Sequence, residues 1–221
     1  MRQPITIAVD GTAASGKGTL AKKLAAHFGF AHLDSGSLYR LTALGVLNAG
    51  GDPANETDAV AAARAVDPSR AADPAIRTDI VGKTASVVAA IPAVRDALKD
   101  FQRNFVARPP GAPGAVIDGR DIGTVIAPKA AAKLYVDARP DIRAHRRWLE
   151  LRSMGVDRDE AELLAELKAR DAADMTRAVS PLARAVDADL LDTSALGIDD
   201  AFARALELVA PKVAAALAVQ R

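Results

Sequence analysis

The apolar positions change period near the start of the chain. The run "ITIAV" (5–9) consists entirely of β-branched and apolar side chains, which is typical of a strand buried on both faces of a parallel sheet. After a glycine-rich stretch, Leu20, Leu24 and Phe28 recur at helical spacing until Gly29 supplies a stop. The pattern therefore predicts a strand, a loop and a helix in succession.

The same two patterns recur through the rest of the chain. Strand-like runs are "GFAHL" (29–33), "AVID" (115–118), "AKLYVDA" (132–138) and "DADLLDTS" (187–194). Helical spacing predicts one short helix within 55–73, helices at 76–91, 93–107, 140–154 and 161–177, and a closing amphipathic helix after 194. Strands that alternate with helices predict an α/β layered fold with a largely parallel sheet.

Several helix starts have recognisable signals. Pro92 and Pro140 stand at first-turn positions, where the missing N–H of proline costs nothing. In "DSGSLYR", Ser35 or Ser37 is the expected N-cap of a helix that runs through "LYRLTALGVLNAG", and Tyr39 is assigned to packing.

Composition narrows the class of protein. A chain of 221 residues suffices for one main domain with small appended lobes. The net charge is +1 and only 4% of residues are aromatic, which argues against nucleic acid or an acidic membrane as a partner. Cysteine is absent and no apolar stretch approaches 18 residues, so we expect a cytoplasmic protein without thiolate or disulfide chemistry.

The glycine-rich stretch carries the first chemical signal. "GTAASGKGT" matches G-x-x-x-x-G-K at Gly11, Gly16 and Lys17, between the predicted strand and helix. In such a loop, backbone N–H groups surround phosphate oxygens, the helix N-terminus adds its dipole, and the lysine reaches the terminal phosphates. A purely structural glycine turn is the alternative interpretation.

The residue after the loop lysine narrows the class further. Gly18 stands where most ATPases and GTPases have the hydroxyl that binds Mg²⁺, and the hydroxyl follows at Thr19. The G-K-G-T form is typical of nucleoside monophosphate kinases. Because the three histidines have no metal-ligand spacing with carboxylates, the metal ligands stay undetermined.

Arginine positions indicate a second anion site. Arg40 lies just past the second predicted strand, and Arg120 follows the third, at the edge where open α/β folds bind ligands. Arg170, Asp174 and Arg177 are spaced i, i+4 and i+7 and should share one helix face. The alternative for that face is a solvated, salt-bridged surface.

The preceding helix carries arginines as well. Arg143, Arg146 and Arg147 are spaced i, i+3 and i+4. Together with the helix at 161–177 they could form a mobile flap that closes on a triphosphate, because an arginine brought to a transferring phosphoryl group accelerates the transfer.

Several stretches, taken in order, resemble one family. "GTAASGKGTLAKKLA", "LDSGSLYR", "IRTDIVGKTASVVAAIPAVRDALKDFQRNF", "VIDGRDIGTVIAP" and "LKARDAADMTRAVSPLARA" together resemble the bacterial cytidylate kinases. The resemblance implies a P-loop NTPase-type three-layer fold, with a helical monophosphate-binding lobe (35–107) and a lid (143–177) within one kinase domain (1–221). It also implies transfer of the γ-phosphoryl group of ATP to CMP or dCMP, with Mg²⁺, by a cytoplasmic monomer.

The resemblance also implies roles for individual residues. The ATP phosphates would contact Gly11, Thr12, Ala13, Ala14, Ser15, Gly16, Lys17, Gly18 and Thr19. Cytosine would contact Ser35, Arg103 and Asp121, the monophosphate would contact Arg40, Arg120 and Arg177, and Asp174 would accept from a sugar hydroxyl. The catalytic group would comprise Lys17, Arg120, Arg170 and Arg177. These roles are chemically consistent, because an aspartate accepts from the cytosine N4 amine and would meet an acceptor in uracil.

The chain departs from the family pattern at two places. The β-rich insert that usually precedes "IRT" is shortened between Val60 and Ile76, and Ala172 and Ala173 stand where relatives often carry charge. A kinase for UMP, AMP or another small metabolite is the alternative enzyme. A nucleotide-dependent switch protein is disfavoured, because a guanine-reading N-K-x-D is absent.

Overall fold

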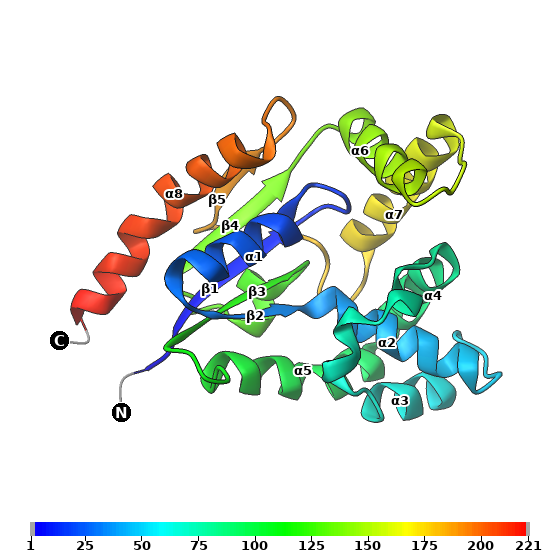
Figure 1. Cartoon of the computed structure of the whole chain (residues 1–221). Coiled ribbons are helices and arrows are strands. Elements are labelled where there is room, and N and C mark those ends of the chain that lie inside the picture. Colours follow the sequence, from blue (N-terminus) through cyan, green and yellow to red (C-terminus); the bar gives the residue numbers. More distant parts are fainter. Residues whose placement is uncertain (1–2, 220–221) are drawn as a thin grey trace. The chain divides into compact units, whose positions relative to one another are not determined.

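The computed structural model of the chain describes residues 3–219 and divides into two compact units. The first, here called the sheet unit, comprises the residues up to His32 and those from Pro109 onward. The second, the helical unit, comprises Leu33–Arg108. Figure 1 gives the elements of both units in chain order.

A five-stranded sheet forms the centre of the sheet unit, and its order is β2-β3-β1-β4-β5. The pairs β1–β3, β1–β4 and β4–β5 are all parallel. The unit boundary falls inside β2, after His32. The strands are β1 (Ile5–Gly11), β2 (Ala31–Asp34), β3 (Gly114–Gly119), β4 (Ala132–Asp137) and β5 (Asp189–Asp192). Their parallel order brings the carboxyl ends of β1, β3, β4 and β5 to one edge, where ligands bind in open α/β sheets.

Two helices cover one face of this sheet, namely α1 (Lys17–Phe28) and α8 (Ile198–Val219) (Figure 1). Their apolar side chains join those of the strands in one core, which explains why β1 reads as a continuous apolar run. Helix α1 ends at Gly29, whose φ of 65° is the left-handed conformation that glycine adopts readily.

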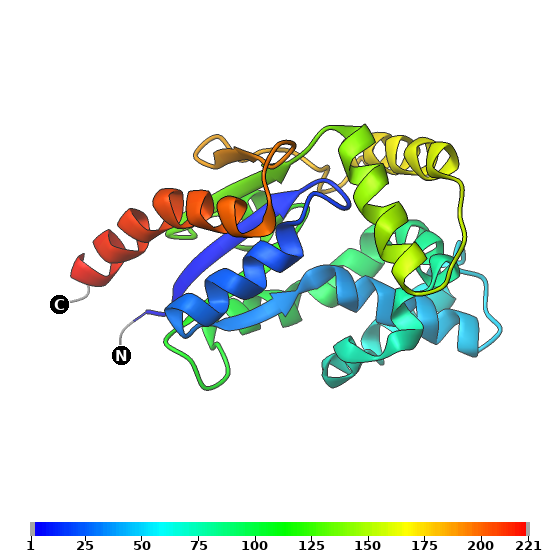
Figure 2. The ribbon, with the colours of Figure 1, turned by 45° about the horizontal axis from the view of Figure 1, so that its top comes forward.

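Two further helices of the sheet unit pack against each other, α6 (Pro140–Ser153) and α7 (Glu160–Thr176). Figure 2 shows them side by side, joined by the loop after Ser153. Pro140 opens α6 as predicted, and the Asp159 carboxylate caps α7 by accepting from the Glu162 N–H.

The helical unit has its own apolar core, built from all four of its α-helices, with α2 and α4 contributing most. Its α-helices are α2 (Ser35–Asn48), α3 (Glu56–Arg64), α4 (Asp79–Ala90) and α5 (Pro92–Ala107), with short 3₁₀ segments at Pro68–Ala72 and Pro74–Arg77. The single short helix expected within 55–73 is confirmed as α3. Tyr39 packs against the core with the Arg95 guanidinium over its ring, so its assignment to packing is confirmed.

Two helix starts in this unit differ from the prediction. The N-cap of α2 is Asp34, not Ser35 or Ser37: its carboxylate accepts the Ser37 N–H at 3.2 Å, while the Ser37 hydroxyl donates to the Asp34 carbonyl at 2.6 Å. A carboxylate caps as well as a hydroxyl does, and here it stands one place earlier. The helix expected from Ile76 begins instead at Asp79, because Pro74 sets a 3₁₀ turn first.

A short π-helix, labelled η3 (Ile122–Ile126), follows β3 and has no counterpart in the sequence-based expectations. Within residues 3–219, no helix is long and apolar enough to cross a membrane.

Candidate active site

The glycine-rich loop lies between β1 and α1, as the sequence predicted. Gly16 is the N-cap of α1 with φ 88°, and Ala14 has φ 57°, a left-handed conformation that is uncommon outside glycine. Position 11 requires glycine because the backbones of β1 and β4 approach closely there. A Cβ at this position would lie 1.9 Å from the Val136 carbonyl oxygen on β4. The loop thus meets the N-terminus of a twelve-residue helix, the geometry that suits an anion.

Side chains of the loop itself and of distant parts of the sheet unit bind the carbonyl groups of this loop. The Thr12 carbonyl accepts from Ser15 Oγ at 3.0 Å and Lys17 Nζ at 3.3 Å. The Ala13 carbonyl accepts from Arg143 at 3.1 Å, and the Ser15 carbonyl from the Thr193 hydroxyl at 3.0 Å. These bonds satisfy the loop's acceptors and suit a loop whose N–H groups serve a phosphate.

The Asp10 carboxylate, at the end of β1, connects the loop strand to the segment after β3. It is 4% exposed, and its two oxygens accept the N–H groups of Ile122 at 2.8 Å and Gly123 at 2.7 Å. Burial raises the pKa of Asp10 to about 6, against the lowering effect of these two N–H groups. Asp10 therefore fixes the backbone directly after Arg120 and Asp121.

An arginine–aspartate cluster lies at the carboxyl end of β3. Arg120 Nε donates to Asp174 Oδ2 at 2.8 Å, and an Arg177 nitrogen lies 3.6 Å from Asp174 Oδ1. Burial by itself raises the pKa of Asp174, but the charges of Arg120, Arg177 and Arg170 outweigh it and hold that pKa below its ordinary value. The two arginines predicted to lie beside Asp174, namely Arg170 and Arg177, therefore both act on this buried carboxylate, and the interpretation as a solvated, salt-bridged surface is wrong.

Asp121 occupies the position directly before η3 and is 5% exposed. Its carbonyl accepts the Val125 N–H at 2.8 Å, so the backbone here is tied to the π-helix. The structure brings Asp121, Arg120 and Asp174 to the edge of the sheet where the phosphate loop begins.

Asp118, the second-last residue of β3, is a candidate that the sequence analysis missed. It is 4% exposed, and its Oδ1 lies 2.8 Å from His32 Nε2. Its Oδ2 lies 3.6 Å from the position that a Cβ on Gly18 would take, beside the start of α1. The aspartate that follows the buried run in "VIDG" could have been predicted as a metal ligand, because an acidic residue at the end of this strand commonly binds the metal ion in P-loop proteins.

The other three predicted acceptor residues belong to the helical unit. Ser35 begins α2 and is 4% exposed. Arg40 donates to the Ile76 carbonyl at 2.7 Å, and its guanidinium lies 3.4 Å from the Cβ position of Gly82 on α4. Arg103 lies on α5. Their contact with a nucleotide stays a prediction.

Two of the arginines predicted to line a flap bind the protein's own backbone instead. Arg143 donates to the carbonyls of Ala138 and Ala13, and Arg146 to those of Thr193 and Leu196. A guanidinium has five donors, so at a strand end it can satisfy several carbonyls at once. In this structure these two side chains stabilise the phosphate-loop region.

A search of protein-family models matches residues 7–211 to the family described as cytidylate kinase. The chain belongs to the cytidylate kinase family. Cytidylate kinases of Rhodospirillum rubrum, Afipia carboxidovorans and a Bradyrhizobium species are 53%, 54% and 55% identical to it. The matches cover 93%, 92% and 92% of this chain, and 97%, 96% and 94% of those relatives.

Solved structures are similar at the level of the fold. A protein from Eubacterium ventriosum has a TM-score of 0.52 at 16% identity, over 93% of this chain and 98% of that one. A gluconokinase from Sinorhizobium meliloti has a TM-score of 0.50 at 14% identity, over 99% and 97%. With the parallel sheet and the phosphate loop, these likenesses confirm the P-loop NTPase type of α/β fold for this cytidylate kinase family member.

Proposed function

We propose that this protein transfers the γ-phosphoryl group of ATP to CMP or dCMP and releases ADP and CDP or dCDP. The observation that carries the proposal is the buried cluster of Arg120, Asp174 and Arg177 at the sheet edge where the phosphate loop begins. A hydrolase or a switch needs only a nucleotide and water, whereas a second set of arginines suits a second phosphorylated substrate.

The ATP phosphates would occupy the loop from Gly11 to Thr19. The backbone N–H groups at the start of α1 and the Lys17 ammonium would neutralise the β- and γ-phosphates. Mg²⁺ would be held through Asp118, whose buried carboxylate faces the start of α1 and is the oxygen ligand that this cation prefers. When bound, the ion would neutralise charge that develops on the phosphate oxygens.

The acceptor would be bound through its phosphate and its base. Arg120, Arg177 and Arg40 would hold the monophosphate, with Arg170 beside them, and Asp174 would accept from the sugar. Asp121, together with Ser35 and Arg103, would bind cytosine, since a carboxylate accepts from the N4 amine. Uracil has an oxygen at that position, and two acceptors would face each other.

The transfer needs no general base, because the acceptor phosphate is already anionic. One of its oxygens forms the new bond to the γ-phosphorus while the bond from that phosphorus to the β–γ bridging oxygen breaks, and ADP leaves with the bonding pair. Lys17, Arg120, Arg170 and Arg177 would act by alignment and by charge neutralisation.

A panel of acceptors tests this proposal. ADP release is measured with CMP, dCMP, UMP, AMP and shikimate at equal concentrations. We expect CMP and dCMP to give the highest kcat/KM. Equal or higher turnover of UMP or AMP would contradict the assignment of cytosine.

Asp121→Asn tests the base assignment directly. The amide offers a donor in place of one carboxylate oxygen, so the ratio of kcat/KM for CMP over UMP should fall by about tenfold or more. Asp141→Asn, on the exposed start of α6, is the matched control and should leave the ratio unchanged. An unchanged ratio in Asp121→Asn removes this residue from base recognition.

We also propose that the enzyme works as a monomer in the cytoplasm on small-molecule substrates. Light scattering during gel filtration, with and without CMP, checks the first point. A stable dimer mass would contradict it.

A further inference from the structure

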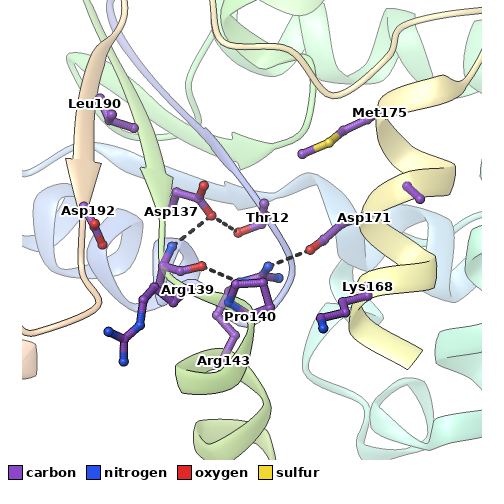
Figure 3. A pocket seen from close by; sticks show the side chains of 12 residues that line it. Thr12, Asp137, Arg139, Pro140, Arg143, Lys168, Asp171, Met175, Leu190 and Asp192 are labelled. Atoms are coloured by element: carbon purple, nitrogen blue, oxygen red, sulfur yellow. Dashed lines mark hydrogen bonds and ion pairs between the residues drawn. The ribbon is translucent and has the colours of Figure 1, made fainter. Parts of the chain in front are cut away.

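The Arg143 side chain joins three elements of the sheet unit. It lies in the first turn of α6 and is 3% exposed. Its nitrogens donate to the Ala138 carbonyl at 2.7 Å and the Ala13 carbonyl at 3.1 Å, and reach the Asp171 carboxylate at 2.6 Å. Figure 3 shows the Arg143–Asp171 pair beside Thr12 and Asp137, at the wall of a cavity of about 530 Å³.

The contact with the phosphate loop falls at its most strained point. Ala13 precedes Ala14, which has φ 57° without being glycine. Such a conformation costs of order 1 kcal/mol or more and persists only where the surroundings hold it. Thr12 is held from the other side, because its hydroxyl donates to the Asp137 carboxylate at 2.7 Å. Arg143 thus binds the carbonyl group of Ala13. This carbonyl belongs to the peptide that joins Ala13 to Ala14, so its direction helps to set the backbone conformation of Ala14.

The contact with α7 falls between residues of the acceptor cluster. Asp171 follows Arg170 directly and precedes Asp174 by three residues, less than one helix turn. Asp171 is 7% exposed, and its Oδ2 is the atom that meets Arg143. A shift of Asp171 along the helix axis would therefore move Arg170 and Asp174 with it.

We propose that Arg143 is a positioning residue that fixes the phosphate loop, through Ala13, and helix α7, through Asp171, in one relative placement. The inference rests on the proposed function in one respect, namely that α7 presents Arg170, Asp174 and Arg177 to the acceptor. Arg143 itself touches no substrate. It sets the distance between the site of the donor phosphates and the site of the acceptor phosphate.

A merely structural ion pair would behave differently. Buried ion pairs are weak evidence for stability, because desolvation offsets most of the attraction between the charges. If the pair only stabilised the fold, its substitution would lower the midpoint of unfolding. The kinetic constants of the protein that remains folded would not change. A positioning role predicts changed nucleotide parameters in fully folded protein, since misplacement by about 1 Å can cost on the order of 100-fold in rate.

Arg143→Lys is the first test. Lysine keeps the charge but presents a single ammonium, which cannot match the planar fork toward three acceptors in three directions. We expect kcat/KM for ATP to fall by about 100-fold. Calorimetric affinity for adenylyl imidodiphosphate should fall by at least about tenfold, because the loop carbonyl loses its partner. Arg139→Lys is the matched control: it makes the same change at an exposed arginine lining the same cavity and should alter both values less than about threefold.

Asp171→Asn tests the contact with α7 separately from the contact with the phosphate loop. It also provides a test of the proposal if Arg143→Lys folds poorly. It leaves the bond from Arg143 to the loop in place but weakens the link to α7. We expect kcat to fall by about tenfold, while the affinity for adenylyl imidodiphosphate stays within about threefold of the wild-type value. The double variant should be no worse than Arg143→Lys alone, because one linkage is broken in both.

Either of two results would overturn the proposal. One is wild-type kinetics and analogue affinity in folded Arg143→Lys. The other is an Asp171→Asn variant that loses stability but keeps kcat. Failure of the proposed function would be recognised separately, because the wild-type protein would then show no preference for CMP in the acceptor panel. The affinity for adenylyl imidodiphosphate would still measure whether Arg143 holds the phosphate loop.

Discussion

Two regions of the sheet unit are proposed to bind phosphate groups, and they are built in opposite ways. The phosphate loop consists of nine consecutive residues, Gly11 to Thr19. They run from the last residue of β1 to the third residue of α1, and these two elements are adjacent in sequence. The Arg120 cluster unites residues 54 positions apart, from the end of β3 and from α7. A contiguous loop needs the local backbone to adopt one conformation, whereas the cluster needs the whole unit to fold before any of its contacts exists.

The two regions also treat buried charge differently. The loop presents backbone dipoles and one ammonium, and Asp10, the second-last residue of its strand, accepts two neutral backbone N–H groups. The cluster surrounds Asp174 with guanidinium groups. Consequently the pKa of Asp10 is raised and that of Asp174 is lowered, although both carboxylates are buried. Substitutions in each region should therefore fail in distinguishable ways.

Lys17→Met should produce the largest effect and should affect the loop alone. Removing the ammonium from the transferring phosphates should lower kcat by about 1,000-fold or more. KM for CMP should change less than about threefold, because the cluster is untouched. Steady-state kinetics with circular dichroism as a folding control measures this, and a kcat within tenfold of wild type would contradict the assignment of Lys17.

The opposite pKa shifts predict opposite pH dependences of stability. Because the folded-state pKa of Asp10 is raised, from 3.8 to about 6, its contribution is present below pH 4 and is lost as pH rises through 6. The unfolding free energy of wild type minus that of Asp10→Asn should fall by about 2 kcal/mol between pH 4 and pH 7, because each pKa unit is worth about 1.4 kcal/mol and the unfolded-state carboxyl is already partly ionised at pH 4. Urea unfolding at several pH values measures it.

Asp174→Asn is the counterpart in that experiment. The pKa of Asp174 is lowered, so its contribution is present above its unfolded pKa of 3.8 and is lost as pH falls through the folded pKa. The wild-type minus Asp174→Asn difference should therefore rise with pH. If these differences in unfolding free energy changed with pH in the same direction for Asp10→Asn and Asp174→Asn, the two carboxylates would not have opposite pKa shifts.

Arg120→Lys tests the cluster without touching the loop. Lysine keeps the charge but cannot bind Asp174 and an acceptor phosphate with a planar fork. We expect kcat/KM for CMP to fall by about 100-fold, with KM for ATP nearly unchanged. A rise in KM for ATP as large as that for CMP would mean that the two sites are not separable.

Gly11→Ala and Gly16→Ala should give the smallest effects, on the free energy of unfolding. At Gly11 the added Cβ meets the Val136 carbonyl, so the strands must shift, at a cost of about 1–3 kcal/mol. At Gly16 there is open space, and only the positive φ opposes alanine, at about 1 kcal/mol. Urea unfolding without nucleotide measures both. Equal losses would mean that close packing does not distinguish the start of the loop from its end.

The difference between the regions also explains what could be predicted from the sequence. Strand β1, the loop and α1 follow from local period and glycine placement, and Pro92 and Pro140 mark helix starts through their own stereochemistry. Asp174 and its arginines could be placed on one side of a helix from spacing alone. Their burial could not be predicted, because Arg120, which pairs with Asp174, follows β3 and lies 54 positions away in the sequence.

The remaining site residues depend on long-range contacts that leave no local pattern. Asp10 reads as the end of a strand, and only the folded chain shows that it caps the backbone at Ile122 and Gly123. Arg143 reads as one of three helical arginines, yet its partners lie on the loop and on α7. The cap of α2 was misassigned for a smaller reason, because Asp34, Ser35 and Ser37 all cap helices well and differ only in register.

The close approach at Gly11 has a consequence for motion. Gly11 is the last residue of β1, pairs with Val136 on β4, and leaves no space between the two backbones. The start of the loop is therefore as immobile as the centre of the sheet. Amide hydrogen exchange tests this, because the N–H groups of β1 up to Gly11 should exchange slowly even in the protein without nucleotide.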